Sequence, residues 1–411
     1  MAGATTASIL AALPPDLQAV SVRAGSRVVV GVWPDEVVVA SGAAAFERVD
    51  SLSPGWWAGF LAYDLGRAVE HVEPRRGPEP DSPADLMPAD LVLARFATRA
   101  VFDPVAGDVE IVGDGPGRPL LEAAVRTRAR PGEHRPTAMH WHSSLSRSEF
   151  EAGVERVLAH LRAGDCYQVN LTRRLTTEHV VDPVGLFAEL ERVNPAPYAG
   201  LLRLAGLSVV SASPECFLRW RGRSVETRPI KGTGTDPGAL RASAKDRAEN
   251  VMIVDLARND LGRVCEPGSI AVPSLCAVEA HPGLHHLVST VRGRLREDAG
   301  VGSLLHATFP PASVTGAPKP RVLQIIEDLE PVRRGVYCGA VGWIDTERDA
   351  GELAVAIRTF TMSGGATHLG VGAGIVADSR PDAEWAETEL KAARLLAAAG
   401  RHDVQAAALA S

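Results

Sequence analysis

Carboxylates on two segments with helical patterns are the first residues that could do chemistry. Glu249 lies in RAENVMIVDLARND and Glu387 lies in AEWAETELKAARLL. Glu387 and Lys391 are spaced i,i+4, so they share a helix face and could form a surface ion pair worth roughly 0.3–0.5 kcal/mol. The alternative is a hard cation such as Mg²⁺, which a few carboxylates hold and a substrate oxygen completes. Spacing by itself favours the ion pair.

Glycine clusters and histidines give weaker signals. Gly232-Thr233-Gly234 and the segment from Gly370 to Gly374 could let backbone amides approach a small anion, although each is more typical of a plain turn. A metal site could be inferred from His281, His285 and His286, but no carboxylate motif accompanies these histidines. The signatures of phosphate-binding loops, α/β-hydrolases and zinc peptidases are absent. Local motifs alone leave the chemistry open.

The first ~140 residues differ in pattern from the rest of the chain. Short β-rich runs occur at 27–33, 36–40, 91–101 and 109–112, and they alternate with loops rich in proline, glycine and acidic residues. The segments 73–88 and 130–144 are the most loop-like. We therefore place the main boundary near residue 140, which gives an N-terminal α+β region over 1–140 and a second domain over 141–411.

The second part mixes helical and strand patterns without strict alternation. A capping box at Ser146–Glu149 predicts a helix that ends at Gly164. Further helices are predicted over 245–263 and 381–399, with Val251, Val254 and Leu261 on one apolar stripe of the first. The segment LLRLAGLSVVSASPECFLRW predicts a pair of strands. Because strands and helices do not alternate regularly, the sequence predicts an α+β fold rather than a doubly wound sheet.

Composition excludes several classes of protein. Of 411 residues, 45% are hydrophobic and 23% are charged, which is a globular balance. The net charge of −7 gives no strong field for nucleic acid or anionic lipid. The five cysteines form no CxxC pair, which indicates reduced thiols. No stretch approaches the ~20 apolar residues of a membrane span, and the N-terminus lacks a basic region for export. We expect a cytoplasmic protein.

Ten ordered strings identify a family. From about residue 146 to 400 the chain resembles the chorismate-utilising enzymes. The strings are GDCYQVNLTRR, SASPECF, ETRPIKGT, RAENVMIVDLARNDLG, HHLVSTVRG, SVTGAPKPRVLQII, RGVYCGAVGWID, AIRTF, GVGAGIVADS and ETELK. GWWAGFLAYDLGR resembles an N-terminal segment of the same subunits. The resemblance implies an anthranilate synthase component I-like fold, in which two β-sheets pack in a layered sandwich with flanking helices.

Two positions distinguish the branches of this family. Members that add water to chorismate carry a lysine where this chain has Gln168, and an amide cannot act as that base. Lys231, in PIKGT, stands where anthranilate synthases have alanine and aminodeoxychorismate synthases have a lysine that attacks C2 of the ring. Such a lysine must be neutral, so we expect burial or a nearby cation such as Arg228 to lower its pKa. The resemblance is therefore strongest to the aminodeoxychorismate synthase large subunits.

The same resemblance implies roles for the remaining site residues. Mg²⁺ held by Glu249 and Glu387 would bind the ring carboxylate of chorismate, with Lys391 nearby. Glu215 would be the general acid for the hydroxyl at C4, with its pKa raised by the pocket, and His286 would lie near the reacting ring. The other substrate-binding residues implied are Gly232, Thr233, Tyr337, Arg358, Gly372, Ala373 and Gly374.

Ammonia would come from another protein. No Gly-x-Cys-x-Gly motif of a glutamine amidotransferase is present, so the resemblance implies a separate glutaminase subunit as partner. The expected product is 4-amino-4-deoxychorismate for 4-aminobenzoate and folate biosynthesis, formed by an enzyme of the aminotransferase class. The alternatives are anthranilate synthase component I, a non-catalytic chorismate-binding subunit, and an isochorismate or salicylate synthase, against which Gln168 argues.

Overall fold

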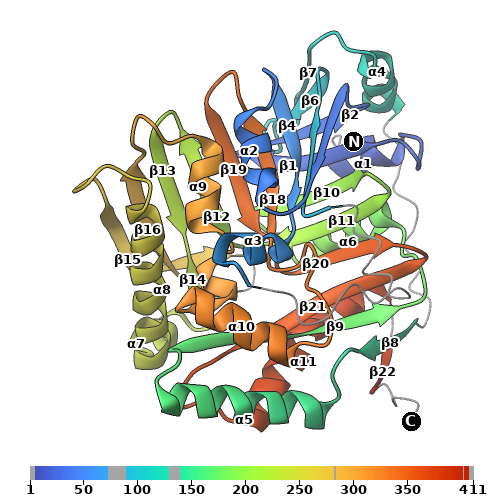
Figure 1. The fold of residues 1–411 in the computed structure, drawn as a ribbon. Helices are drawn as coiled ribbons and strands as arrows, with labels where there is room; N and C mark the ends of the chain where they lie inside the picture. The colour runs from blue at the N-terminus through green and yellow to red at the C-terminus, as the bar shows by residue number, and fades with distance from the viewer. Residues whose placement is uncertain are drawn as a thin grey trace.

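Two antiparallel sheets form the centre of the computed structural model (Figure 1). It describes residues 5–72, 89–127, 129, 139–281, 284–400 and 402–406, the last by backbone only. The loop predicted over 73–88 lies outside these residues, as does most of the segment predicted over 130–144, of which Met139–Ser143 is a strand. Strands before and after residue 140 pair within both sheets, through β1–β10 and β4–β18. A domain boundary near 140 remains a prediction.

The larger sheet has 12 strands. In spatial order they are β22 (His402–Ala406), β8 (Met139–Ser143), β9 (Gln168–Thr177), β21 (Ala366–Ile375), β20 (Thr359–Ser363), β11 (Leu207–Ser213), β10 (Tyr198–Leu204), β1 (Ala19–Ala24), β2 (Arg27–Val32), β6 (Arg99–Phe102) and β7 (Val109–Val112), with β17 (Gly316–Ala317) beside β9. All pairs are antiparallel except β22–β8.

The smaller sheet has 10 strands. In spatial order they are β14 (Ile230–Gly234), β16 (Leu284–Arg294), β13 (Ser224–Arg228), β12 (Cys216–Arg221), β19 (Ala350–Val355), β18 (Ala340–Asp345), β4 (Trp56–Leu61), β5 (Leu91–Arg95) and β3 (Glu36–Ala40), with β15 (Ala271–His281) beside β16.

Helices cover the outer face of each sheet. They are α1 (Thr6–Ala11), α2 (Ala44–Asp50), α3 (Gly66–Glu70), α4 (Arg118–Thr127), α5 (Arg147–Ala163), α6 (Pro183–Val193), α7 (Pro237–Ala242), α8 (Ala244–Gly262), α9 (Val301–Thr308), α10 (Lys319–Leu329) and α11 (Pro381–Ala399). None of these described helices has the length and apolar character that crossing a bilayer requires.

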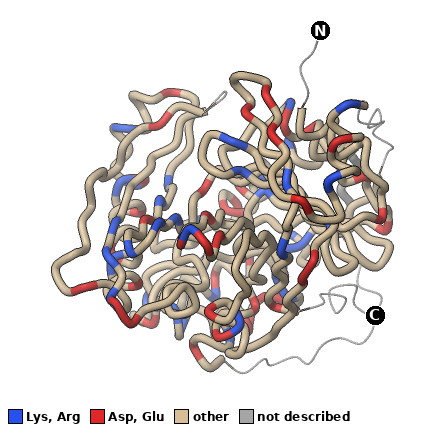
Figure 2. The backbone as a smooth tube through the Cα atoms, turned by 90° about the horizontal axis from the view of Figure 1, so that it is seen from above, with Lys and Arg blue, Asp and Glu red and all other residues tan. Residues whose placement is uncertain are grey.

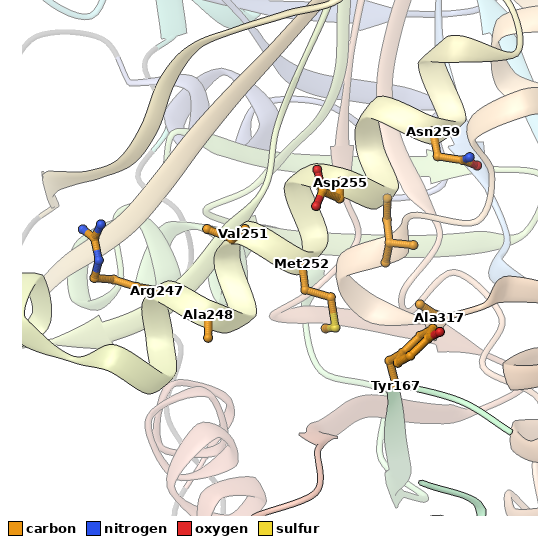
Figure 3. Close-up of a pocket in the computed structure, with 9 residues that line it drawn as sticks. Tyr167, Arg247, Ala248, Val251, Met252, Asp255, Asn259 and Ala317 are labelled. Carbon is orange, nitrogen blue, oxygen red and sulfur yellow. The ribbon is translucent and has the colours of Figure 1, made fainter. Parts of the chain in front are cut away.

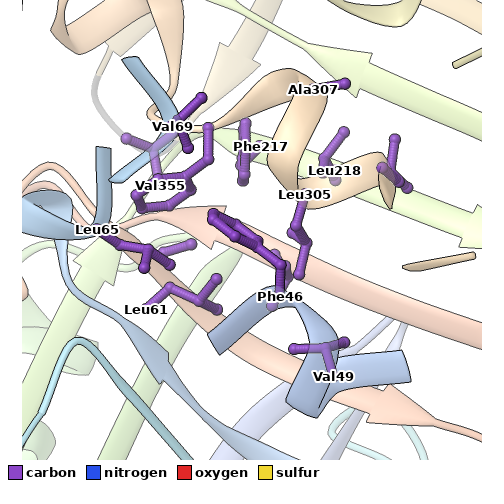
Figure 4. Close-up of a cluster of buried hydrophobic side chains, with 14 of the residues drawn as sticks. Phe46, Val49, Leu61, Leu65, Val69, Phe217, Leu218, Leu305, Ala307 and Val355 are labelled. Atoms are coloured by element: carbon purple, nitrogen blue, oxygen red, sulfur yellow. The ribbon is translucent and has the colours of Figure 1, made fainter. Parts of the chain in front are cut away.

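Buried side chains divide into an inner core and outer cores. The inner core joins the facing sides of the two sheets, with Val20 and Leu202 of the larger sheet and Phe60 of the smaller in one cluster. An outer core lies between the smaller sheet and α2, α8 and α9, where Phe46 and Leu305 pack near Leu61 (Figure 4). A corresponding core joins the larger sheet to α1, α4, α6 and α11. The predicted α+β fold with two packed sheets and flanking helices is confirmed.

Local signals predicted several elements well and two poorly. The capping box of α5 is present, with Ser146 accepting from the Glu149 backbone, and Gly164 ends the helix in the left-handed conformation. The run at 91–101, by contrast, contains two strands in different sheets. The predicted stripe on α8 is wrong at Val251, which is 40% exposed. Periodicity identifies a strand or helix without showing which neighbours will cover it.

Candidate active site

Lys231 lies on β14, an edge strand of the smaller sheet, and not in a turn. Lys231 pairs with Leu287 of β16, and Thr233 pairs with His286, with a register shift between the two. Gly232 has φ of +76°, and a β-carbon there would lie 2.9 Å from Cβ of Asp246. Glycine is therefore needed for this bulge and for the close approach of α8. The Lys231 ammonium donates to the carbonyl oxygen of Ser313 at 3.1 Å.

Glu215 lies where the chain passes from the larger sheet to the smaller, between β11 and β12. Its backbone is fixed by bonds to Ser213 and Val355, and the residue is 4% exposed. Its carboxyl accepts hydrogen bonds from the Ser313 hydroxyl and the Ile230 backbone N–H. Burial raises the pKa of Glu215 to about 7, against the lowering by Ser313, Lys231 and Ile230. A substantial fraction of this group is therefore protonated at neutral pH.

Burial also lowers the pKa of Lys231 below its usual value. Glu249 and Glu215 raise the pKa in opposition, while Lys391 lowers it further. Arg228 does not act as the expected cation, because its guanidinium pairs with Glu279 at 2.5 Å. The prediction of a depressed lysine pKa is confirmed in direction, and burial is its main cause.

Gln168 presents an unpartnered amide at the start of β9. The residue is fully buried, and neither Nε2 nor Oε1 has a hydrogen-bond partner in the described chain. An ideal β-carbon on Gly374 would lie 3.2 Å from Nε2 of Gln168 and 3.7 Å from Nζ of Lys231. The amide and the amine therefore lie near one another over the backbone of Gly374. A buried polar group without a partner is costly, so this amide is suited to bind a ligand.

Gly370, Gly372 and Gly374 alternate along β21, so one face of this strand has no side chains and exposes its backbone. A β-carbon on Gly370 would lie 2.1 Å from Cδ1 of Tyr337, so the tyrosine ring lies against this strand. The Gly372 carbonyl accepts from Lys391 at 2.9 Å, and Ala373 belongs to the opposite, apolar core. Ala366–Ile375 is a continuous strand paired with β9, so this glycine cluster lies within a strand and not in a plain turn.

His286 and Arg358 lie beside this region. Nδ1 of His286 is 2.8 Å from the Thr233 hydroxyl, and the His281 ring packs edge-on at 4.7 Å between centroids. Burial, reinforced by Arg358, lowers the pKa of His286 to about 4, so the imidazole is neutral at pH 7. Arg358 has φ of +51°, and only burial and Arg394 shift the pKa of its guanidinium, with no described carboxylate acting on it. An arginine free of acidic partners is suited to a substrate carboxylate.

The two predicted carboxylates approach one another from different helices. Glu249 of α8 and Glu387 of α11 interact electrostatically with each other and with Lys231. Glu387 also pairs with Lys391 at 2.6 Å, with side chains 46% and 50% exposed. Glu249 lies 4.0 Å from Lys245. The predicted surface ion pair is therefore present, and it borders the site.

Sequence reasoning missed a second acidic residue on each helix. Asp246 acts on Glu249, and Glu384, which is 5% exposed, acts on Glu387. Each precedes its partner by three residues and therefore shares its helix face. That i,i+3 repetition of acids in both segments was the signal that could have found them.

The donor chemistry at this end fits Mg²⁺. Among the described residues no three histidine, cysteine, aspartate or glutamate side chains converge as around a preformed ion. Mg²⁺ usually retains water and binds through one or two carboxylates together with substrate oxygens. Glu249 and Glu387 meet that need, and their mutual repulsion gives a divalent cation a reason to bind.

Three comparisons place the chain among known proteins. The chorismate binding enzyme family matches residues 23–397. The chain is 40% identical over 349 residues to aminodeoxychorismate synthase component 1 of Klebsiella aerogenes, covering 82% of this chain and 76% of that protein. It is 38% identical over 381 residues to anthranilate synthase component 1 of Streptomyces coelicolor, covering 86% of this chain and 74% of that protein.

Solved structures share the fold. Anthranilate synthase component I from Streptococcus pneumoniae TIGR4 superposes with a TM-score of 0.78 and 26% identity, covering 90% of this chain and 92% of that one. The menaquinone-specific isochorismate synthase of Escherichia coli gives a TM-score of 0.75 at 19% identity, covering 96% and 91%. The second likeness shows the fold alone.

Proposed function

The chain belongs to the chorismate-binding enzymes, and from that premise we propose that it transfers ammonia to C4 of chorismate, giving 4-amino-4-deoxychorismate. The observation that carries this proposal is the pairing of a half-buried, pKa-lowered Lys231 with a buried, pKa-raised Glu215, joined through Ser313. Two groups whose environments push their pKa values toward neutrality from opposite sides suit a nucleophile and a general acid.

The first half-reaction uses these two groups. The neutral Lys231 amine attacks C2 of the ring, both ring double bonds shift, and the C4–O bond breaks. Glu215 donates its proton to the departing oxygen, so that water leaves. The result is a covalent adduct between Lys231 and the ring, with Glu215 as carboxylate.

The second half-reaction restores the enzyme. Ammonia attacks C4, the double bonds shift back, and the C2–N bond to Lys231 breaks. The ammonium formed at C4 returns one proton to Glu215, so chorismate and ammonia become aminodeoxychorismate and water. Gln168 lies close enough to Lys231, over Gly374, to orient a hydroxyl or an incoming amine through its unpartnered amide.

The remaining residues bind the dianionic substrate. Glu249 and Glu387 would hold Mg²⁺, which when bound neutralises a carboxylate of chorismate. Arg358 and the β21 backbone from Gly372 to Gly374 bind carboxylate oxygens, and Tyr337 covers Gly370 beside them. His286, neutral and tied to Thr233, orients the C4 side of the ring. We infer a cytoplasmic enzyme whose product supplies 4-aminobenzoate and folate synthesis.

A product assay tests this function. Purified protein is mixed with chorismate, Mg²⁺ and excess ammonium at mildly alkaline pH, and products are followed by mass spectrometry and fluorescence. We expect aminodeoxychorismate from the wild type and none from Lys231→Ala. Fluorescent anthranilate from the wild type would overturn the proposal in favour of anthranilate synthase, which the 38% identity to the Streptomyces protein makes the second candidate.

A further inference from the structure

A groove on the outer side of α8 exposes apolar side chains. The groove has a volume of about 670 Å³ and is lined by residues of α8, by Tyr167 and by Ala317 (Figure 3). Tyr167 is 72% exposed and Val251 is 40% exposed, while Met252 and Leu256 beside them are half-buried. Clustered apolar exposure on a helix whose other face is buried indicates a binding surface. We call this the α8 groove.

The α8 groove and the active site share one wall. Tyr167 directly precedes the fully buried Gln168, and its backbone N–H donates to the carbonyl of Ala317 at 2.8 Å. Ala317 is in turn the β17 partner of Gln168. On α8, Glu249 faces the site, and Val251, two residues further along the helix, faces the groove. A molecule in the groove therefore lies one strand or one helix away from Gln168 and Lys231.

Charged residues of both signs border the apolar centre. Arg247 and Asp255 line the groove, and Asp255 pairs at 2.8 Å with Arg258, with side chains 63% and 53% exposed. An apolar centre with a mixed-charge rim is the usual anatomy of a protein–protein interface.

We propose that the α8 groove docks the glutamine-hydrolysing subunit that supplies ammonia, an inference that rests on the proposed function. All five cysteines are buried and free, so the chain offers no accessible thiolate for releasing ammonia from glutamine itself. In neutral water ammonia is mostly ammonium, which has no free lone pair, so only a small fraction can attack C4. A subunit seated on the shared wall releases it beside Gln168, and the relatives carry the name component 1, which agrees with a second component.

Paired valine variants test the docking surface. Val251→Glu places a charge at the centre of the groove, whereas Val180→Glu alters an equally plain valine, 59% exposed, beyond the opposite end of β9. Each is assayed with the same organism's glutamine-hydrolysing subunit, once with glutamine and once with ammonium chloride. We expect Val251→Glu to lower the glutamine-dependent rate and the affinity for the subunit at least about tenfold, with the ammonium-dependent rate unchanged. Val180→Glu changes neither.

If Val251→Glu loses the ammonium-dependent rate as well, Asp255→Lys on the rim replaces it as the test variant. Retention of glutamine-dependent turnover and of complex formation by the test variant overturns the proposal. So does conversion of a wild-type dimer to a monomer with that turnover intact, which would assign the groove to a second copy of the chain. Failure of the wild type to convert chorismate with ammonium would instead overturn the proposed function.

Discussion

The two halves of the candidate site differ in how completely the protein arranges them. In the buried half, Glu215, Gln168 and His286 are each less than 5% exposed and are held by strands of both sheets. In the helical half, Glu387 and Lys391 are about half exposed and extend from α11 toward α8. Basic and acidic residues are interspersed in this molecule rather than separated by sign (Figure 2). The charges of the helical half therefore reflect individual ion pairs and not a surface patch of one sign.

This difference separates chemistry from binding. Burial moves the pKa of Glu215 up and that of Lys231 down before any substrate arrives, so both groups are already prepared for the covalent steps proposed above. The carboxylates of the helical half are balanced by Lys245 and Lys391 instead. A cation and a substrate carboxylate would replace these lysine contacts on binding. Substitutions in the two halves should consequently fail in different ways.

Replacement of Lys231 should have the largest effect. Lys231→Ala removes the proposed nucleophile, and we expect turnover to fall on the order of 10⁴-fold. Intact-protein mass spectrometry after mixing with chorismate and Mg²⁺ without ammonia should show an adduct of chorismate less water on the wild type only. An adduct on the alanine variant would show that another residue is the nucleophile. Chorismate affinity should change little, because the helical half is untouched.

Glu215→Gln should follow, with a loss of about 10²–10³-fold in adduct formation. The pKa of Glu215 is about 7 and only its protonated form can donate, so wild-type adduct formation should fall as the pH rises through 7. In Glu215→Gln, adduct formation should show no such fall as the pH rises. If adduct formation by this variant fell in the same way above pH 7, another group would be the source of the proton.

The same variant should alter how stability depends on pH. The folded state binds the extra proton between the ordinary value of 4.5 and about 7, so the free energy of unfolding of the wild type falls as pH rises across that window. The fall attributable to Glu215 is on the order of 3 kcal/mol. Chemical denaturation of Glu215→Gln from pH 4.5 to 8 should give a flatter profile. Parallel profiles would show that the carboxyl is not held protonated.

Metal dependence should change most in the helical half. Glu249→Gln and Glu387→Gln should raise the Mg²⁺ concentration for half-maximal chorismate binding by about 10–100-fold, since each removes one of two carboxylates. Calorimetric titration measures this without turnover. Glu387→Gln should alter the free energy of unfolding by under about 0.5 kcal/mol, because its pair with Lys391 is exposed. Unchanged Mg²⁺ dependence would remove these glutamates from the cation site.

Sequence reasoning succeeded where the signal is local. The capping box that begins α5 and the glycine that ends it involve residues within one helical turn, so they could be read from the chain directly. The extent of α8 was predicted almost to the residue, yet the burial of its faces was not, because Val251 lies beside a groove formed with Tyr167. Which face of a helix is covered depends on elements distant in sequence.

Local sequence signals could not predict how residues distant in the sequence come together at the candidate site. The family resemblance predicted the residues, but the bridge of Ser313 between Glu215 and Lys231 joins segments some 80 residues apart or more. Likewise, Arg228 looked like a partner for Lys231 from its position three residues away, whereas β-strand geometry directs it to Glu279. Neighbours in a strand point to opposite faces or lie far along it, so proximity in sequence is a poor guide to electrostatic coupling.

Of these changes, Gln168→Leu should lower turnover the least. It should also make the protein more stable. Leucine replaces a fully buried amide that has no partner in the described chain, so the free energy of unfolding should rise by about 1 kcal/mol. Turnover should fall about tenfold, because that amide no longer orients the reacting groups beside Lys231. Gln324→Leu, on the exposed side of α10, is the matched control and should alter neither by much. A loss of stability in Gln168→Leu would mean that the amide contributes to packing rather than being kept for a ligand.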